Sequence, residues 1–155
     1  MATKVSAAIA VLDEAGKAAF CLWLAGQVER SLVPEEAERL GITHAVAMLL
    51  SWGQGSTVSG DELSDLLLNT NDEGLFASID PRQPRETDQA ISAVGSVICF
   101  IAWIAYKNAG EHIPDGINQV DDEIISWAAG QAISAQAVRE ESCLSLIGEL
   151  AAIDK

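Results

Sequence analysis

Two histidines and three cysteines are the side chains of this 155-residue sequence best suited to catalysis or metal binding. His44 lies in an apolar segment with helical spacing and His112 in a predicted turn, and neither has a His or Cys partner at ligand spacing. Cys21, Cys99 and Cys143 each lie in an apolar stretch, which predicts buried thiols in a reducing compartment. We therefore assign no catalytic or metal-binding residue and expect a protein that is not an enzyme.

The glycine-containing segment 53–58 has some features of a phosphate-binding loop. It follows a predicted helix rather than a strand, lacks a third glycine in step and has no lysine to meet a phosphate. The Glu-x-x-His pairs of a di-iron helical bundle are also missing from the sequence. No cofactor is expected.

The segment from Asn69 to Asp80 resembles a calcium-binding loop, with oxygen donors at positions one, three, five and twelve and Gly74 at position six. Asn69 stands where Asp is expected and Asp80 where a bidentate Glu is expected. Pro81 and Pro84 occupy the place of the second helix. A plain acidic loop is favoured, and the alternative is an acidic helical protein that binds calcium or regulates a partner.

Negative charge is concentrated in two stretches of the chain, which has 23 acidic and 9 basic residues and a net charge of −14. No basic residue lies between Arg39 and Arg82 or between Lys107 and Arg139, whereas eleven carboxylates do. Nucleic-acid binding is not expected, because it requires clustered Lys and Arg. A field of one sign favours rapid capture of a basic protein partner.

The elements that must position these carboxylates are predicted to be helices joined by turns. Residues 89–106 carry no formal charge, and we interpret them as part of a buried central helix near 88–108 rather than a membrane span. The length suits one domain over residues 1–155. The predicted fold is all-α, with about six helices packed around the central helix.

Local signals place several helix ends. Ser59 and Glu62 form a capping-box pattern that predicts a helix over 61–68. Pro34 predicts the first turn of a helix that runs through Trp52. Residues 5–28 predict one bent helix or two short ones.

The later helix ends follow the same logic. Thr87 or Asp88 is predicted to cap the central helix, and Gly110 is predicted to end it. Asp121 is predicted to start a further helix, in which Trp127 and Ala128 are apolar residues at helical spacing.

Five short motifs follow one another along the chain: Leu49-Leu50-Ser51-Trp52, Ser59-Gly60-Asp61-Glu62-Leu63, Asn71-Asp72-Glu73-Gly74-Leu75, a long small-residue helix ending Ala105-Tyr106-Lys107, and Pro114 followed by Val120-Asp121-Asp122-Glu123. Their order and spacing resemble a family of all-α immunity proteins encoded beside bacterial polymorphic toxins, including contact-dependent growth inhibition systems. The resemblance spans about residues 40 to 130. Trp52 and Tyr106 stand where the family pattern has aromatics, and we expect both to pack in the core.

The resemblance implies a non-enzymatic inhibitor in the bacterial cytoplasm that binds a cognate toxin domain and occludes its active site. Together with the charge pattern, it predicts a basic toxin domain as partner, a nuclease or another enzyme acting in the cytoplasm, and no membrane or nucleic-acid partner. The sequence leaves the oligomeric state open. The candidate toxin-binding residues are carboxylates in the acidic stretches: Asp61, Asp65, Asp72, Glu73, Asp121, Asp122 and Glu123.

Overall fold

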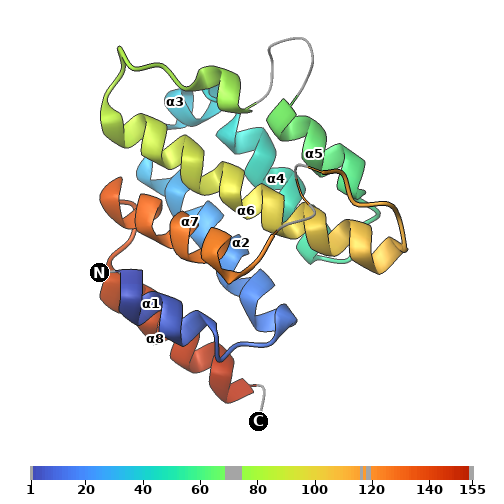
Figure 1. Ribbon diagram of the computed structural model, residues 1–155. Coiled ribbons are helices and arrows are strands. Elements are labelled where there is room, and N and C mark those ends of the chain that lie inside the picture. Colours follow the sequence, from blue (N-terminus) through green and yellow to red (C-terminus); the bar gives the residue numbers. More distant parts are fainter. Residues whose placement is uncertain (1, 69–74, 116, 118–119, 154–155) are drawn as a thin grey trace.

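The computed structural model describes residues 2–68, 75–115, 117 and 120–153, and all regular elements within these residues are helices (Figure 1). The all-α prediction is therefore confirmed. In chain order the elements are α1 (Ala2–Ile9), α2 (Glu14–Ser31), α3 (Pro34–Arg39), α4 (Ile42–Gly53), α5 (Gly60–Leu68), the 3-10 helix η1 (Leu75–Ser78), α6 (Arg85–Ala109), α7 (Asp122–Ser134) and α8 (Glu140–Ile153).

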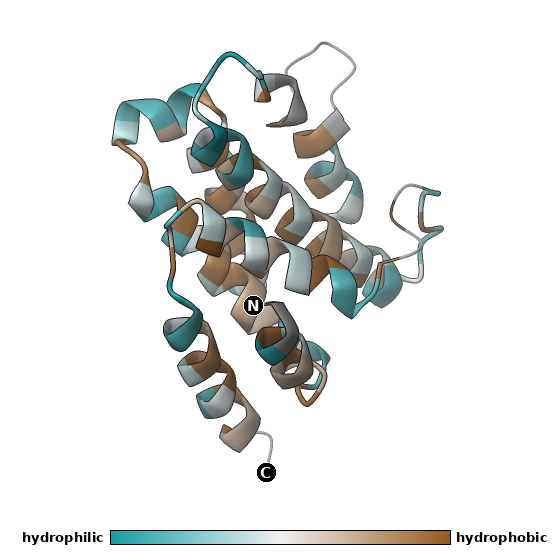
Figure 2. Ribbon diagram, turned by 60° about the vertical axis from the view of Figure 1, so that its left-hand side comes forward, coloured by the Kyte–Doolittle hydropathy of each residue, from teal (hydrophilic) through white to brown (hydrophobic). Residues whose placement is uncertain are grey.

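The helix α6 lies at the centre of the molecule, as predicted, and is covered by α2, α4, α5, α7 and η1 (Figure 1). Its length and composition would allow it to cross a membrane, but 78% of its most apolar 18-residue window is buried inside the protein. Hydrophobic segments face the interior of the bundle, and hydrophilic ones lie at the outer turns and loops (Figure 2). Burial within the bundle thus accounts for the hydrophobicity of α6 without a bilayer.

The N-terminal segment forms two helices because Asp13 starts a new one. Its side chain accepts a hydrogen bond of 2.7 Å from the backbone N–H of Gly16, which caps α2. The preceding helix α1 packs on α7 and α8 and forms with α8 a layer beyond α7 and α2 (Figure 1). The hydroxyls of Ser6 and Ser126, 2.9 Å apart, join α1 to α7.

The prediction of one helix from Pro34 through Trp52 is wrong, because Gly41 interrupts it. Gly41 has a φ of 81°, in the left-handed region that glycine adopts at little cost. The chain therefore ends α3 and restarts as α4 in a new direction. This division contributes to the difference between about six expected helices and the eight α-helices in the described residues.

The predicted capping box is confirmed. The Ser59 hydroxyl accepts the N–H of Glu62 at 3.1 Å, and the Glu62 carboxylate accepts the N–H of Ser59 at 3.3 Å. Gly110 ends α6 with a φ of 69°, and the Asp121 side chain caps α7 by accepting the N–H of Glu123 at 2.9 Å, both as predicted.

The predicted cap of α6 by Thr87 or Asp88 is wrong. The cap position is Pro84, three residues before Thr87, and Pro84 provides no side-chain cap. The carboxylate of Asp88 instead accepts the N–H of Asp80 at 3.1 Å and the side-chain amide of Gln83 at 2.7 Å. A residue in the first turn of α6 thus holds the preceding loop.

The start of α5 packs closely against the end of α6. A Cβ atom at Gly60 would lie 2.6 Å from Cγ of Tyr106. The Tyr106 ring is 2% exposed, and its hydroxyl is hydrogen-bonded to Asp61 and Ser64, so the ring has little freedom to move away. The absence of a side chain at Gly60 therefore sets the distance between α5 and α6.

Replacing Gly60 with Ala is expected to lower the free energy of unfolding by about 1–3 kcal/mol, the usual cost of overpacking. Gly26 in α2 is the matched control, because a Cβ there meets nothing within 4 Å. Ala at position 26 should raise the stability by about 0.5–1 kcal/mol through helix propensity. Urea unfolding followed by circular dichroism measures both effects. A Gly60→Ala variant as stable as the wild type would contradict the close packing of α5 on Tyr106.

Candidate protein-binding surface

The side chains with nucleophilic or ligand chemistry do not form a site in the described part of the chain. Cys21 and Cys143 are buried and Cys99 is half-buried, and burial raises the pKa of Cys99 and Cys143 to about 11. Thiols with such pKa values are poor nucleophiles and poor metal ligands at neutral pH. His44 and His112 are exposed, and the described residues contain no group of three His, Cys, Asp or Glu able to hold a metal.

The first turn of α5 presents carboxylates with different roles. The Asp61 carboxylate accepts the phenol hydrogen of Tyr106 at 2.6 Å, so it ties α5 to the C-terminal end of α6. Asp65 lies one turn later and is exposed, with no ion pair in the part of the chain that the structure describes. Asp65 is therefore more available than Asp61 to a partner.

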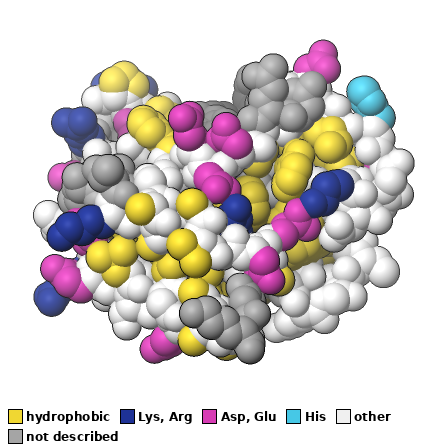
Figure 3. All heavy atoms as spheres, turned by 60° about the horizontal axis from the view of Figure 1, so that its bottom comes forward, with side chains coloured by type: hydrophobic (Ala, Val, Ile, Leu, Met, Phe, Trp, Pro, Cys, Tyr) yellow, Lys and Arg dark blue, Asp and Glu magenta, His cyan; other side chains and the backbone are white. Residues whose placement is uncertain are grey.

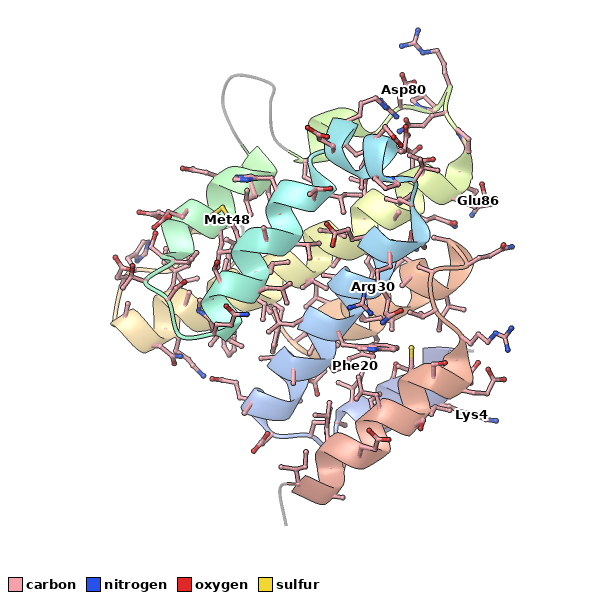
Figure 4. All side chains as sticks on the ribbon, turned by 180° about the vertical axis from the view of Figure 1, so that it is seen from behind. Lys4, Phe20, Arg30, Met48, Asp80 and Glu86 are labelled. Atoms are coloured by element: carbon pink, nitrogen blue, oxygen red, sulfur yellow. The ribbon has the colours of Figure 1, made fainter. Side chains whose placement is uncertain are left out.

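Asp65 lies at an open groove of about 370 Å³ between α4 and α5. Met48 points from α4 toward α5 in this region (Figure 4). The groove therefore combines acidic and apolar groups, an arrangement that suits a long basic side chain. It is lined by Gly41, His44, Met48, Glu62, Asp65, Leu66 and Leu75.

The three carboxylates at the start of α7 also differ. Asp121 is engaged as the helix cap, and Asp122 forms an ion pair of 2.8 Å with Lys17 of α2. Glu123 is exposed, and its carboxylate has no ion-pair partner among the described residues. Glu123 is thus the member of this group most available to a partner.

The structure brings the acidic starts of α5 and α7 to the same half of α6. Asp61 accepts a hydrogen bond from Tyr106, and Asp122 lines a small hollow that also includes Trp103. The nearby amine of Lys107 pairs with Glu14 and lies 4.6 Å from the centre of the Trp103 ring. Lys17 and Lys107, the lysines near these helix starts, are therefore both paired with carboxylates of the protein itself.

The candidate residues Asp72 and Glu73 lie outside the described residues, as does the first half of the segment Asn69 to Asp80. Asp80 itself pairs with the guanidinium of Arg82 at 3.0 Å and accepts its backbone N–H at 2.9 Å. These hydrogen bonds from Arg82 hold the pKa of Asp80 below its usual value. The carboxylate at the twelfth position of the calcium pattern is thus already paired with a cationic side chain.

A second groove, of about 630 Å³, lies between α1 and α7 and was missed by the sequence analysis. Trp127, placed with Ala128 among the apolar residues of α7, is 57% exposed at this groove, whereas Ala128 is buried. The four-residue spacing of Glu123 and Trp127 is the one sequence signal that could have indicated it. The lining residues are Ser6, Ala10, Asp122, Glu123, Ser126, Trp127, Gly130, Gln131 and Ser134.

A family model described as Immunity protein Imm6 matches residues 16–135. The chain belongs to the Imm6 family. The match includes the acidic starts of α5 and α7, and the resemblance to immunity proteins of toxin systems is confirmed. No curated protein and no solved structure matches the chain. Membership in the Imm6 family indicates a toxin-neutralising function and a toxin as partner.

The bond between Tyr106 and Asp61 in this Imm6 protein has a spectroscopic consequence, because Tyr106 is the only tyrosine in the sequence. Burial, followed by the hydrogen bond to Asp61, raises the pKa of Tyr106 above its ordinary value of 10.0. The raised pKa means that the folded state binds the phenol proton more tightly than the unfolded state does. The stabilisation from this protonated phenol is therefore complete below about pH 10, and it is lost as the pH rises through the pKa of the folded state.

An alkaline titration followed by phenolate absorbance should therefore give a midpoint above that of a free tyrosine. In Asp61→Asn the midpoint should fall, because the carboxylate charge is gone, whereas Glu141→Gln on α8 should leave it unchanged. A midpoint at the ordinary value in the folded protein would show that α5 does not hold the phenol.

Proposed function

We propose that this Imm6 protein neutralises one cognate toxin by binding its toxin domain and occluding the active site or the entry of substrate. The family match over residues 16–135 is the observation that carries the proposal. The contact is made through the acidic surface, which we define as the exposed carboxylates in the first two turns of α5 and the first turn of α7, with Asp65 and Glu123 as its central members.

The charge of the chain supports a basic partner. The protein carries a net charge of −14, and Lys17 and Lys107 near the acidic surface are already paired with Asp122 and Glu14. Figure 3 shows one face of the molecule, on which acidic side chains are interspersed with hydrophobic and some basic side chains. Such a face attracts a basic protein over a distance and gives it apolar contacts after docking.

The toxin is a nuclease or another enzyme acting in the cytoplasm. An enzyme that holds an anionic substrate with Lys or Arg presents these side chains at its active site. Carboxylates of the acidic surface can pair with them and exclude the substrate. Inhibition then depends on the amount of immunity protein, without turnover, cofactor or nucleic acid.

The candidate residues have different tasks in this proposal. Asp65 and Glu123 contact the toxin, whereas Asp61 and Asp121 hold the ends of helices through hydrogen bonds to Tyr106 and Glu123. Asp122 neutralises Lys17. Asp72 and Glu73 lie on the chain between α5 and η1 and remain candidate contacts. The protein acts in the bacterial cytoplasm as the immunity partner of a polymorphic toxin or of a contact-dependent growth inhibition system.

Co-expression with the product of the gene immediately upstream tests the proposal. We expect cells that produce the toxin to grow only when this protein is present, and we expect a one-to-one complex after co-purification at low and at high salt. An upstream product that is harmless to cells and is not retained at either salt concentration would overturn the assignment.

The acidic surface is tested by association kinetics. The double variant Asp65→Asn and Glu123→Gln should bind the toxin domain about two- to tenfold more slowly at low salt and with a weaker salt dependence, because steering is reduced. The matched control is Glu141→Gln with Glu149→Gln, which removes two exposed carboxylates from α8. Equal slowing by both pairs would show that net charge, rather than this surface, guides association.

A further inference from the structure

The groove between α1 and α7 contains an exposed aromatic ring that is held in a fixed position. The indole N–H of Trp127 donates a hydrogen bond of 3.0 Å to the hydroxyl of Ser92 on α6. Because its polar group is satisfied within the protein, the 57% exposed indole offers a partner apolar surface and a ring face. A ring held in this way loses little conformational entropy on binding.

An exposed carboxylate lies next to this ring. Glu123 precedes Trp127 by one helical turn, so both side chains project from the same side of α7 into the groove. The neighbouring Asp122 is neutralised by Lys17, whereas Glu123 has no ion pair in the part of the chain that the structure describes. The groove thus combines one negative charge with an aromatic surface.

The remaining residues that line the groove are uncharged, and most of them have small side chains. Ser126, Gly130 and Ser134 of α7 lie opposite Ala10 of α1, and a Cβ atom at Gly130 would meet nothing within 4 Å. A volume of about 630 Å³ leaves room for a long side chain beside the ring. The shape therefore admits a side chain that places its charged end between Glu123 and Trp127.

We propose that an arginine of the toxin enters this groove, stacks its guanidinium on Trp127 and pairs with Glu123. A guanidinium is planar, weakly hydrated and able to form two parallel hydrogen bonds to a carboxylate while its face lies on an aromatic ring. A lysine ammonium provides a point charge without these contacts. The inference rests on the proposed function and names the chemistry of the toxin side chain that is bound.

The stacking of the arginine on Trp127 stabilises the docked complex and does not contribute to the first encounter of the two proteins. Long-range attraction comes from the whole acidic surface, whereas stacking in a partly desolvated groove forms only in the docked complex. Aromatic side chains in such positions carry a large share of the binding energy in protein interfaces. Loss of the contact should therefore change the dissociation rate more than the association rate.

Binding kinetics of the co-purified toxin domain test the groove. We expect Trp127→Ala and Gly130→Leu each to raise the dissociation rate at least tenfold, the first by removing the ring and the second by filling the groove. Gly148→Leu on α8 is the matched control, because a Cβ there also meets nothing within 4 Å, and its rate should equal that of the wild type. Circular dichroism of each variant establishes that it is folded.

A second experiment identifies the toxin side chain. Each arginine of the toxin domain is changed to lysine, and the dissociation rate is measured against wild-type protein and against Trp127→Ala. One arginine should give a tenfold loss with the wild type and almost none with Trp127→Ala, since the contact is already missing there. The absence of any such coupled arginine would overturn the assignment of the occupant.

The outcomes separate this inference from the function on which it rests. A wild-type complex whose dissociation is unaffected by Trp127→Ala and Gly130→Leu would overturn the groove as a toxin contact and leave the inhibitor function in place. If the wild-type protein forms no complex at all, the proposed function fails, and the groove proposal fails with it.

Discussion

The burial of α6 is the constraint on which the rest of the structure depends. A helix of 25 residues with buried side chains along most of its length must be covered from several sides, and no single amphipathic neighbour can do this. The helices α2, α4, α5 and α7 each contribute an apolar face, and η1 covers the N-terminal part. The order of these helices around α6 then fixes which helix ends lie near one another at the surface.

This arrangement also determines where charge can lie. The core accepts almost no polar side chain, with Ser96 the one buried polar residue among those described. Carboxylates gather at the first turns of α5 and α7, where the helix dipole favours them, and these turns border the same half of α6. Lys17 and Lys107 connect helices as ion pairs with Asp122 and Glu14, so these lysines do not offset the charges of Asp65 and Glu123.

Several helix ends are decided by local chemistry, and these could be predicted from the sequence. Neighbouring residues alone determine the capping box at Ser59, the helix end at Gly110 and the cap at Asp121. The long apolar run of α6 must be buried in a protein outside a membrane, so it could be predicted to form the central helix. Features that depend on the packing of elements distant in the sequence could not be predicted in this way. The exposure of Trp127 depends on how α7 packs, and the groove depends on α1, whose Ser6 meets Ser126 across 120 residues of sequence. Asp61 could be placed at a helix start, but its bond to Tyr106 requires the tertiary structure.

The short length of α1 has a consequence for the groove that it borders. Helices shorter than about 12 residues are marginal in water by themselves, so the eight residues of α1 are helical because Val5 and Ile9 are buried against the bundle. The family match begins at residue 16, after α1, and the helices it covers contain α6 and all of its neighbours. One wall of the groove is thus formed by a helix outside the family match, whereas Trp127 lies on α7 within it, so the shape of the groove depends on a segment that the family pattern does not specify.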